Sequence, residues 1–120
     1  MTKTQALHSL FSQFGVSAYP SGNVPEDTEF PYLTYTKGVG ASYESTLHYY
    51  DYTDSELGPD DAIETICAFF RNGGTHVYYD KGAIWAYLSH DDTEWYASAD
   101  EGDRKRKHRI ANITLNFEGE

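Results

Sequence analysis

The chain has 120 residues and a formal net charge of −10 at pH 7, from 19 acidic and 9 basic side chains. That length suits one hydrophobic core, so we expect residues 1–120 to form a single domain. So acidic a surface repels phosphate groups, and direct nucleic-acid binding is therefore not expected. The 11 tyrosines favour a sheet that buries ring bodies and leaves hydroxyl groups in water.

The cysteine count and the hydropathy pattern together predict where the protein is found. A single cysteine is typical of a reducing compartment. Cys67 is the single cysteine, which excludes an internal disulfide framework. No stretch approaches the roughly 18 apolar residues of a membrane helix, and residues 1–14 lack the continuous apolar core of a signal peptide. We therefore expect a soluble, cytoplasmic protein with no membrane partner.

The first expected element is a helix near the N-terminus. Apolar residues recur there at i, i+3, i+4 and i+7, namely Leu7, Leu10, Phe11 and Phe14. Thr2 and Gln5 have the spacing of a capping box, and Gly15 can end the helix.

A loop and a hairpin are expected next. Residues 17–31 are rich in Pro, Gly, Ser, Asn and acids, which predicts a long, exposed, acidic loop with at most a short extended piece. Residues 32–36 and 46–53 predict two antiparallel strands, with residues 38–45 as the long tip between them. Alternation along the second strand would separate Leu47, Tyr49 and Asp51 from His48, Tyr50 and Tyr52.

A second helix is predicted from residue 58. Gly58-Pro59-Asp60-Asp61 places a proline in the first turn and two acids where they favour the helix dipole. The apolar residues that follow at helical spacing are Ile63, Ile66, Cys67 and Phe70. Asn72-Gly73-Gly74 then ends the helix.

Strands account for most of the remaining chain. Residues 76–79 and 83–88 predict a tight hairpin around Asp80-Lys81-Gly82, a three-residue connection with a left-handed glycine. Residues 89–103 are polar and acidic, with Trp95-Tyr96 either in a short strand or anchoring a loop. Alternation over residues 109–117 gives the strongest strand signal. Together these elements predict an α+β fold, an antiparallel β-sheet with two amphipathic helices packed on one face.

No pattern in the sequence predicts catalysis, a metal site or a cofactor. Cys67 lies on the apolar stripe of the second helix, so we expect a buried core residue and not a reactive thiol. The densest set of potential metal or acid–base groups lacks the spacing of a preformed site and fits solvated loop charges better; it comprises His90, Asp91, Asp92 and Glu94. We therefore expect a protein that is not an enzyme.

Basic residues are concentrated after the acidic segment of residues 100–103. Five of the nine fall in one run: Arg104, Lys105, Arg106, Lys107 and Arg109. This run is open to four interpretations: contact with a neighbouring subunit, a solvated strand edge guarded by charge, a partner for acids of the same chain, or contact with nucleic acid. Segregated charge of this kind suits head-to-tail association.

Several segments, taken in order, resemble one protein family. They are Phe30-Pro31-Tyr32-Leu33-Thr34-Tyr35, Asn72-Gly73-Gly74, Asp80-Lys81-Gly82-Ala83-Ile84-Trp85, and Arg109-Ile110-Ala111-Asn112-Ile113-Thr114-Leu115-Asn116-Phe117. With the first helix, the acidic loop and the tyrosine-rich strand, this order is similar to that of the tail-terminator proteins (tail-completion, often labelled minor capsid proteins) of long-tailed bacteriophages. The likeness covers nearly the whole chain and depends on the order of the segments more than on any one motif.

The resemblance implies a structural subunit of the virion tail that is assembled in the host cytoplasm. It would form a homo-hexameric ring that caps the tail tube, stops polymerisation of the major tail tube protein and docks to the head–tail connector protein. The tip at residues 38–45 and the loop at residues 89–103 would make such contacts. The alternative is a small acidic protein-binding or regulatory domain, of head-completion or immunity type.

Aromatic and basic side chains are the candidate interface residues for either function. Large aromatic rings anchor protein interfaces, and charge complementarity selects partners. The candidates are Tyr43, Tyr49, Tyr50, Tyr52, Trp95, Tyr96, Arg104, Lys105, Arg106 and Lys107.

Overall fold

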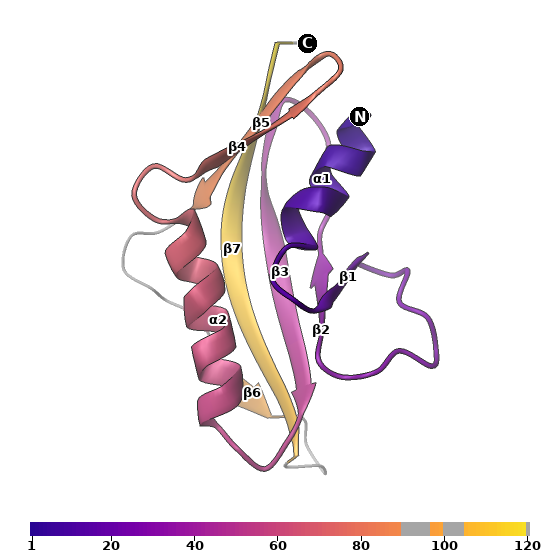
Figure 1. Cartoon of the computed structure of the whole chain (residues 1–120), viewed down its shortest axis with the longest axis vertical. Coiled ribbons are helices and arrows are strands. Elements are labelled where there is room, and N and C mark those ends of the chain that lie inside the picture. Colours follow the sequence, from indigo (N-terminus) through magenta and orange to yellow (C-terminus); the bar gives the residue numbers. More distant parts are fainter. Residues whose placement is uncertain (90–96, 100–104, 120) are drawn as a thin grey trace.

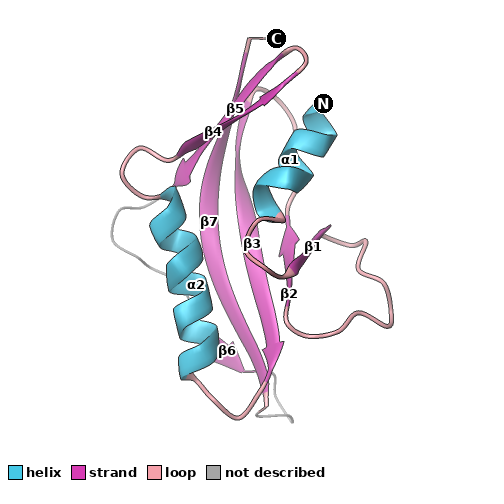
Figure 2. Ribbon diagram, viewed as in Figure 1, coloured by secondary structure: helices cyan, strands magenta, loops and turns pink. Residues whose placement is uncertain are grey.

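The computed structural model describes residues 1–89, 97–99 and 105–119. In this part of the chain two helices lie on one face of a mostly antiparallel sheet, so the predicted α+β fold is confirmed (Figures 1 and 2). The elements are α1 (Lys3–Phe11), β1 (Ser17–Pro20), β2 (Tyr32–Tyr35), β3 (Ser42–Tyr52), α2 (Leu57–Phe70), β4 (Thr75–Tyr79), β5 (Gly82–Leu88), β6 (Ala97–Ala99) and β7 (Arg106–Glu118). Neither helix has the length and apolar character needed to cross a membrane.

Helix α1 begins at the predicted capping box. The Thr2 side chain accepts a hydrogen bond from the Gln5 backbone, and the Gln5 side chain accepts one from the Thr2 backbone. The helix ends at Phe11, earlier than the spacing to Phe14 suggests. Phe14 nevertheless packs on the second helix, because its ring lies 5.9 Å from that of Phe70 and 5.4 Å from that of Phe69.

One edge of the sheet departs from the antiparallel pairing of the other strands. Residues 17–20 of the expected loop form β1, which pairs in parallel with β2. Ala18 is 3% exposed opposite the fully buried Leu33, so this short strand adds to the core. The tip between β2 and β3 is also shorter than expected, because β3 already begins at Ser42.

The hairpin of β4 and β5 has a two-residue connection, not the expected three. Tyr79 pairs with Gly82, which leaves Asp80 and Lys81 as the turn. The predicted left-handed conformation of Gly82 is likewise wrong, since its φ is not positive. Gly82 is needed for space, because a Cβ atom there would lie 2.0 Å from the carbonyl oxygen of Glu118.

Strand β7 is the central strand of the sheet, whose order is β1-β2-β3-β7-β5-β4. It pairs with β3 along one side, while β5 and β6 pair with different parts of its other side. The strand begins at Arg106, so it includes part of the basic run. Its alternate residues from Lys107 to Phe117 are buried beneath the helices, as the period of two predicts.

The hydrophobic core lies between the helices and this row of residues. Ile113 and Leu115 of β7 are fully buried, as are Phe11 of α1 and Phe70 of α2. The aromatic rings of Phe11 and Phe70 lie 6.2 Å apart, which joins the two helices in one core. Cys67 is 2% exposed, which confirms its predicted place in the core.

Candidate interaction surface

The face of the sheet opposite α1 and α2 carries the candidate site. We call it the helix-free face, because neither helix covers it (Figure 1). Strand pairing defines its residues, since directly paired residues project on the same side of a sheet. The register pairs Tyr32 with Tyr50, Tyr50 with His108, and Tyr52 with Arg106, all within the row that alternates with the buried row.

A continuous series of rings crosses three strands of the helix-free face. Tyr32 of β2 lies 5.1 Å from Tyr50 of β3, and Tyr50 lies 4.5 Å from His108 of β7, measured between ring centroids. Phe30, just before β2, extends the series, with its ring centroid 5.5 Å from that of Tyr32 and 5.9 Å from that of Tyr52. Such cross-strand ring pairs stabilise the sheet, and their outer faces offer rigid contact area.

A second aromatic group lies on the same face along β4 and β5. Trp85 lies 6.0 Å from His76, with ring planes only 4° apart, and 4.7 Å from Tyr87. The indole nitrogen of Trp85 donates a hydrogen bond to the Gly73 carbonyl, which fixes its orientation. Tyr78 is 72% exposed beside this group, with its ring 6.3 Å from that of His76, so its ring reaches the solvent.

Two histidines meet at the centre of the helix-free face. Nδ1 of His48 lies 2.7 Å from Nε2 of His108, although the residues are 60 positions apart. The ring centroids are 4.9 Å apart, so the rings approach each other edge to edge through these nitrogens. Burial lowers the pKa of His48 below 6.5, which favours a neutral ring.

The middle of the helix-free face is nearly free of charge. Among its described strand residues the acids are Glu44 and Glu118, both toward one end of the sheet. Arg106 lies at the other end, with its guanidinium 5.9 Å from the ring of Phe30. In a chain of net charge −10, this face can approach another protein surface with little repulsion.

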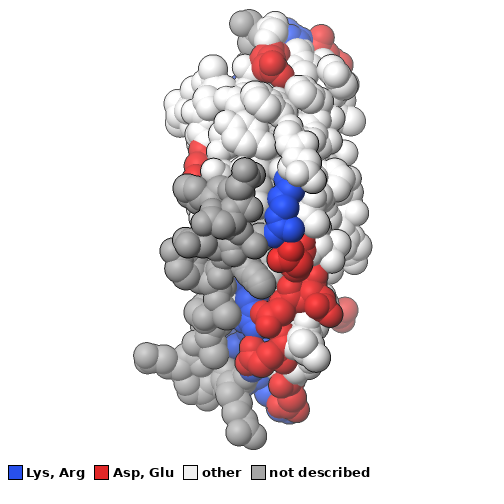
Figure 3. Space-filling model, turned by 90° about the vertical axis from the view of Figure 1, so that its left-hand side faces the viewer, with Lys and Arg blue, Asp and Glu red and all other residues white. Residues whose placement is uncertain are grey.

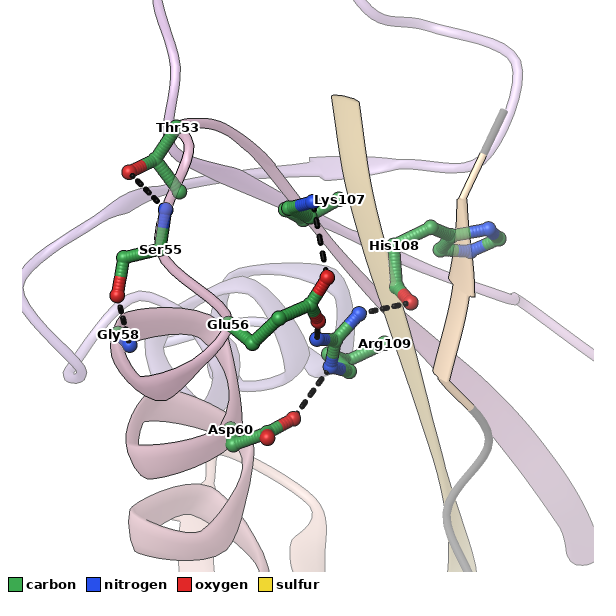
Figure 4. A network of polar contacts seen from close by, with 8 residues as sticks. All are labelled: Thr53, Ser55, Glu56, Gly58, Asp60, Lys107, His108 and Arg109. Atoms are coloured by element: carbon green, nitrogen blue, oxygen red, sulfur yellow. Dashed lines mark hydrogen bonds and ion pairs between the residues drawn. The ribbon is translucent and has the colours of Figure 1, made fainter. Parts of the chain in front are cut away.

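The helix side of β7 holds an ion cluster that binds the start of α2 (Figure 4). Arg109 donates from Nε to Asp60 and from Nη2 to Glu56, at 2.7 and 2.6 Å. Nζ of Lys107 lies 2.9 Å from the other carboxylate oxygen of Glu56. Hydrogen bonds from Lys107 and then Arg109 lower the pKa of Glu56.

Figure 3 shows how charged side chains are distributed over the surface on the α2 side of the molecule. Acidic atoms gather in the lower half beside a narrow line of basic atoms, and much of the upper half is uncharged. Farther along α2, Arg71 and Glu64 form another ion pair at 2.8 Å. Acids of the same chain therefore neutralise part of the basic run, which was one of its four interpretations.

The structure divides the predicted interface residues between the two faces. Tyr50, Tyr52 and Arg106 come together on the helix-free face. Tyr43 instead faces the helix side, where its ring lies 5.5 Å from Phe117. Trp95, Tyr96 and Arg104 lie outside the described residues.

The other candidates have partners within the chain. Tyr49 is 5% exposed, and burial, followed by the nearby Asp51, raises its pKa to about 12. Lys107 is bound to Glu56, and Nζ of Lys105 lies 3.9 Å from Asp54. The sequence interpretation of these residues as interface contacts is thus weakest at Tyr49 and Lys107.

Sequence reasoning missed several residues of the helix-free face, including Tyr32, Trp85 and both paired histidines. Alternation along the sequence places His48 on the same side as Tyr50 but does not identify its partner in β7. The alternation of β7 contains the missing signal, because His108 occupies the row opposite Arg109. Only the pairing register shows that this row continues the tyrosines of β3.

Burial also limits the chemistry of the single cysteine. Desolvation raises the pKa of Cys67 to about 11, so the thiol is protonated near neutral pH. Within the described residues, no group of three or more His, Cys, Asp or Glu side chains is placed to hold a metal ion.

The comparison with known proteins adds no relative. No protein-family model matches the chain, and no curated protein sequence is similar to it. The likeness to tail-terminator proteins accordingly depends on the ordered segments of the sequence alone.

Proposed function

We propose that the chain is a structural subunit that binds other protein surfaces through its helix-free face, and that it forms a ring of the tail-terminator type. The observation that carries this proposal is the series of partly exposed rings across β2, β3 and β7 on a face with little charge. Large rigid rings with few charges among them are typical of the central part of protein interfaces. No catalytic step is part of this proposal.

In the proposed role, identical subunits associate into a ring, and the ring binds the tail tube on one side and the head connector on the other. The helix-free face supplies the contact area, and the separated charges on the α2 side supply orientation. The homo-hexameric state, the tube protein, the connector protein and the place in the virion tail all come from the sequence resemblance.

A small acidic binding domain is the second candidate. The acidic surface beside α2 supports it, because such a surface suits a basic partner. A monomer at every concentration that binds a basic protein would favour this candidate over a ring subunit.

Native mass spectrometry over a range of concentrations tests the ring directly. We expect a discrete closed oligomer whose population rises with concentration, and electron microscopy should show it as a ring. A strict monomer at the highest soluble concentration, with no binding to purified tail tubes, would contradict the proposal.

Paired variants locate the contact surface. Tyr50→Ser with Tyr52→Ser removes two rings of the helix-free face, and we expect oligomer dissociation to shift to at least about tenfold higher concentration. Leu57→Ser is the matched control, since Leu57 is 73% exposed at the start of α2, away from this face. Equal oligomer stability in the two variants would exclude the helix-free face as the subunit contact.

A further inference from the structure

His48 and His108 are two potential metal ligands that the sheet holds next to each other. Their facing nitrogens, Nδ1 and Nε2, are 2.7 Å apart, and a bond of that length requires one ring to donate a proton and the other to accept it. At least one ring is therefore neutral, with its lone pair directed at the other ring. A neutral imidazole nitrogen is also the form that binds transition metals.

The spacing of the two nitrogens is close to that of ligands on one metal ion. Zinc–nitrogen bonds of about 2.0–2.1 Å at a tetrahedral angle place two ligand nitrogens about 3.3 Å apart. The rings would need to separate by only about 0.6 Å from their present distance of 2.7 Å. Rotation of the two side chains can supply this movement without any shift of the strands.

Neighbouring groups hold both rings in place before any metal binds. Tyr50 stacks on His108, with ring planes 17° apart, and lies 6.0 Å from His48 with planes 11° apart. Opposite His48 in the sheet stand Thr34 of β2 and Ile110 of β7. Both histidines are partly buried, so a bound ion would be partly shielded from water yet still reached from the helix-free face.

We propose that His48 and His108 form a two-histidine site for a borderline divalent transition-metal ion such as Zn²⁺. When both rings are neutral, the donor ring moves its single proton from the shared nitrogen to its other ring nitrogen, so both facing nitrogens present lone pairs to the ion and no net proton is released; water completes the coordination. Two protein ligands leave positions open, so the site differs from a closed structural zinc site with four protein ligands. Mg²⁺ is not expected to bind here, because it prefers oxygen ligands.

Titration of the full chain with ZnCl₂, followed by NMR of the histidine ring protons, tests the site without any substitution. We expect the His48 and His108 ring signals to shift together and first, ahead of those of His76. MgCl₂ should leave them unchanged. Ring signals of His48 and His108 that do not respond to Zn²⁺ would overturn the proposal.

Calorimetry of three variants gives the second measurement. Because loss of even an outer-sphere partner costs 10–100-fold in metal affinity, His48→Gln or His108→Gln should weaken Zn²⁺ binding at least about tenfold. His76→Gln is the matched control. His76 lies on the same face, with its ring 6.0 Å from that of Trp85, and is not part of the histidine pair. Unchanged affinity in the first two variants, each checked for folding by its amide spectrum, would also overturn the proposal. Both measurements are made at chain concentrations where native mass spectrometry shows the monomer, so their outcome does not depend on the proposed ring.

Discussion

Arg109 and the acids that bind it differ sharply in their contact with water. The Arg109 side chain is 2% exposed, whereas the Glu56 and Asp60 side chains are 62% and 41% exposed. A buried cation without a partner is costly, but a partly exposed carboxylate can be hydrated when its partner is lost. The two halves of this ion cluster therefore contribute differently to stability.

The difference leads to a prediction on the free energy of unfolding. Glu56→Gln with Asp60→Asn leaves Arg109 buried without its anionic partners, and we expect a loss of about 3–5 kcal/mol. Arg109→Met leaves only hydratable carboxylates and fills a similar volume, so its loss should be no more than about 2 kcal/mol. Urea unfolding measures both values, and a larger loss in the methionine variant would contradict this account.

His48 predicts a pH dependence of stability. Burial lowers its pKa in the folded protein below the ordinary 6.5. As the pH falls below that value, the unfolded chain takes up a proton before the folded one does. The stabilisation is therefore complete above pH 6.5 and is lost as the pH falls toward the lowered pKa; below it no further loss occurs.

His48→Gln isolates this contribution. Urea unfolding at about pH 7.5 and about pH 5 gives the loss of stability on acidification, which should be smaller in the variant than in the parent chain. The same loss in the variant and in the parent chain would show that His48 does not titrate as its burial implies.

At the scale of elements, two glycines predict opposite effects of an added methyl group. Gly82 starts β5, where a Cβ atom would lie 2.0 Å from the backbone of β7. Gly58 lies in the first turn of α2, with no atom within 4 Å of its added Cβ. Gly82→Ala should lower the free energy of unfolding by more than about 1 kcal/mol, and Gly58→Ala should raise it by about 0.5–1 kcal/mol.

Thermal and urea unfolding of the two alanine variants measure these effects. Amide exchange provides a local readout, since Gly82→Ala should increase exchange along the pairing of β5 with β7. A stable Gly82→Ala protein with unchanged protection would contradict the close approach of these strands.

The placement of the strands, unlike their existence, could be predicted only in part. The capping box of α1 and the alternation of β7 are local patterns, and the structure confirms both. The parallel pairing of β1 was not predictable from so short and polar a segment, because its stability comes from Ala18 packing opposite Leu33. For the candidate site, Tyr50, Tyr52 and Arg106 were identified, but the histidine pair needed the register of β3 and β7.

At the scale of the whole molecule, alternation along β7 explains how the basic run is used. Lys107 and Arg109 point to the helix side and bind acids at the start of α2, while Arg106 projects from the other face. Nζ of Lys105 lies 3.9 Å from Asp54 of the same chain. In the part of the run that the structure describes, contact between subunits should therefore depend most on Arg106.

Charge reversal tests this expectation. Arg106→Glu should weaken self-association and reduce its dependence on salt, because an attractive charge pair between subunits is lost. Lys81→Glu, an exposed residue in the turn of β4 and β5, makes the same charge change elsewhere. Native mass spectra at low and high salt measure the oligomer population of both variants. An equal change in the two variants would exclude a specific role for Arg106.

The sequence by itself determined the kind and order of most elements, the single core and the acidic character of the chain. Helical period, capping and alternation are properties of neighbouring residues, so they can be read without knowledge of the fold. Beyond the two predicted hairpins, the tertiary structure alone decided the neighbours of β1 and β7, and hence which row of β7 is covered by helices. For that reason it separated Arg106 from Arg109 and brought His48 to His108, because pairing between distant strands depends on the packing of the whole core.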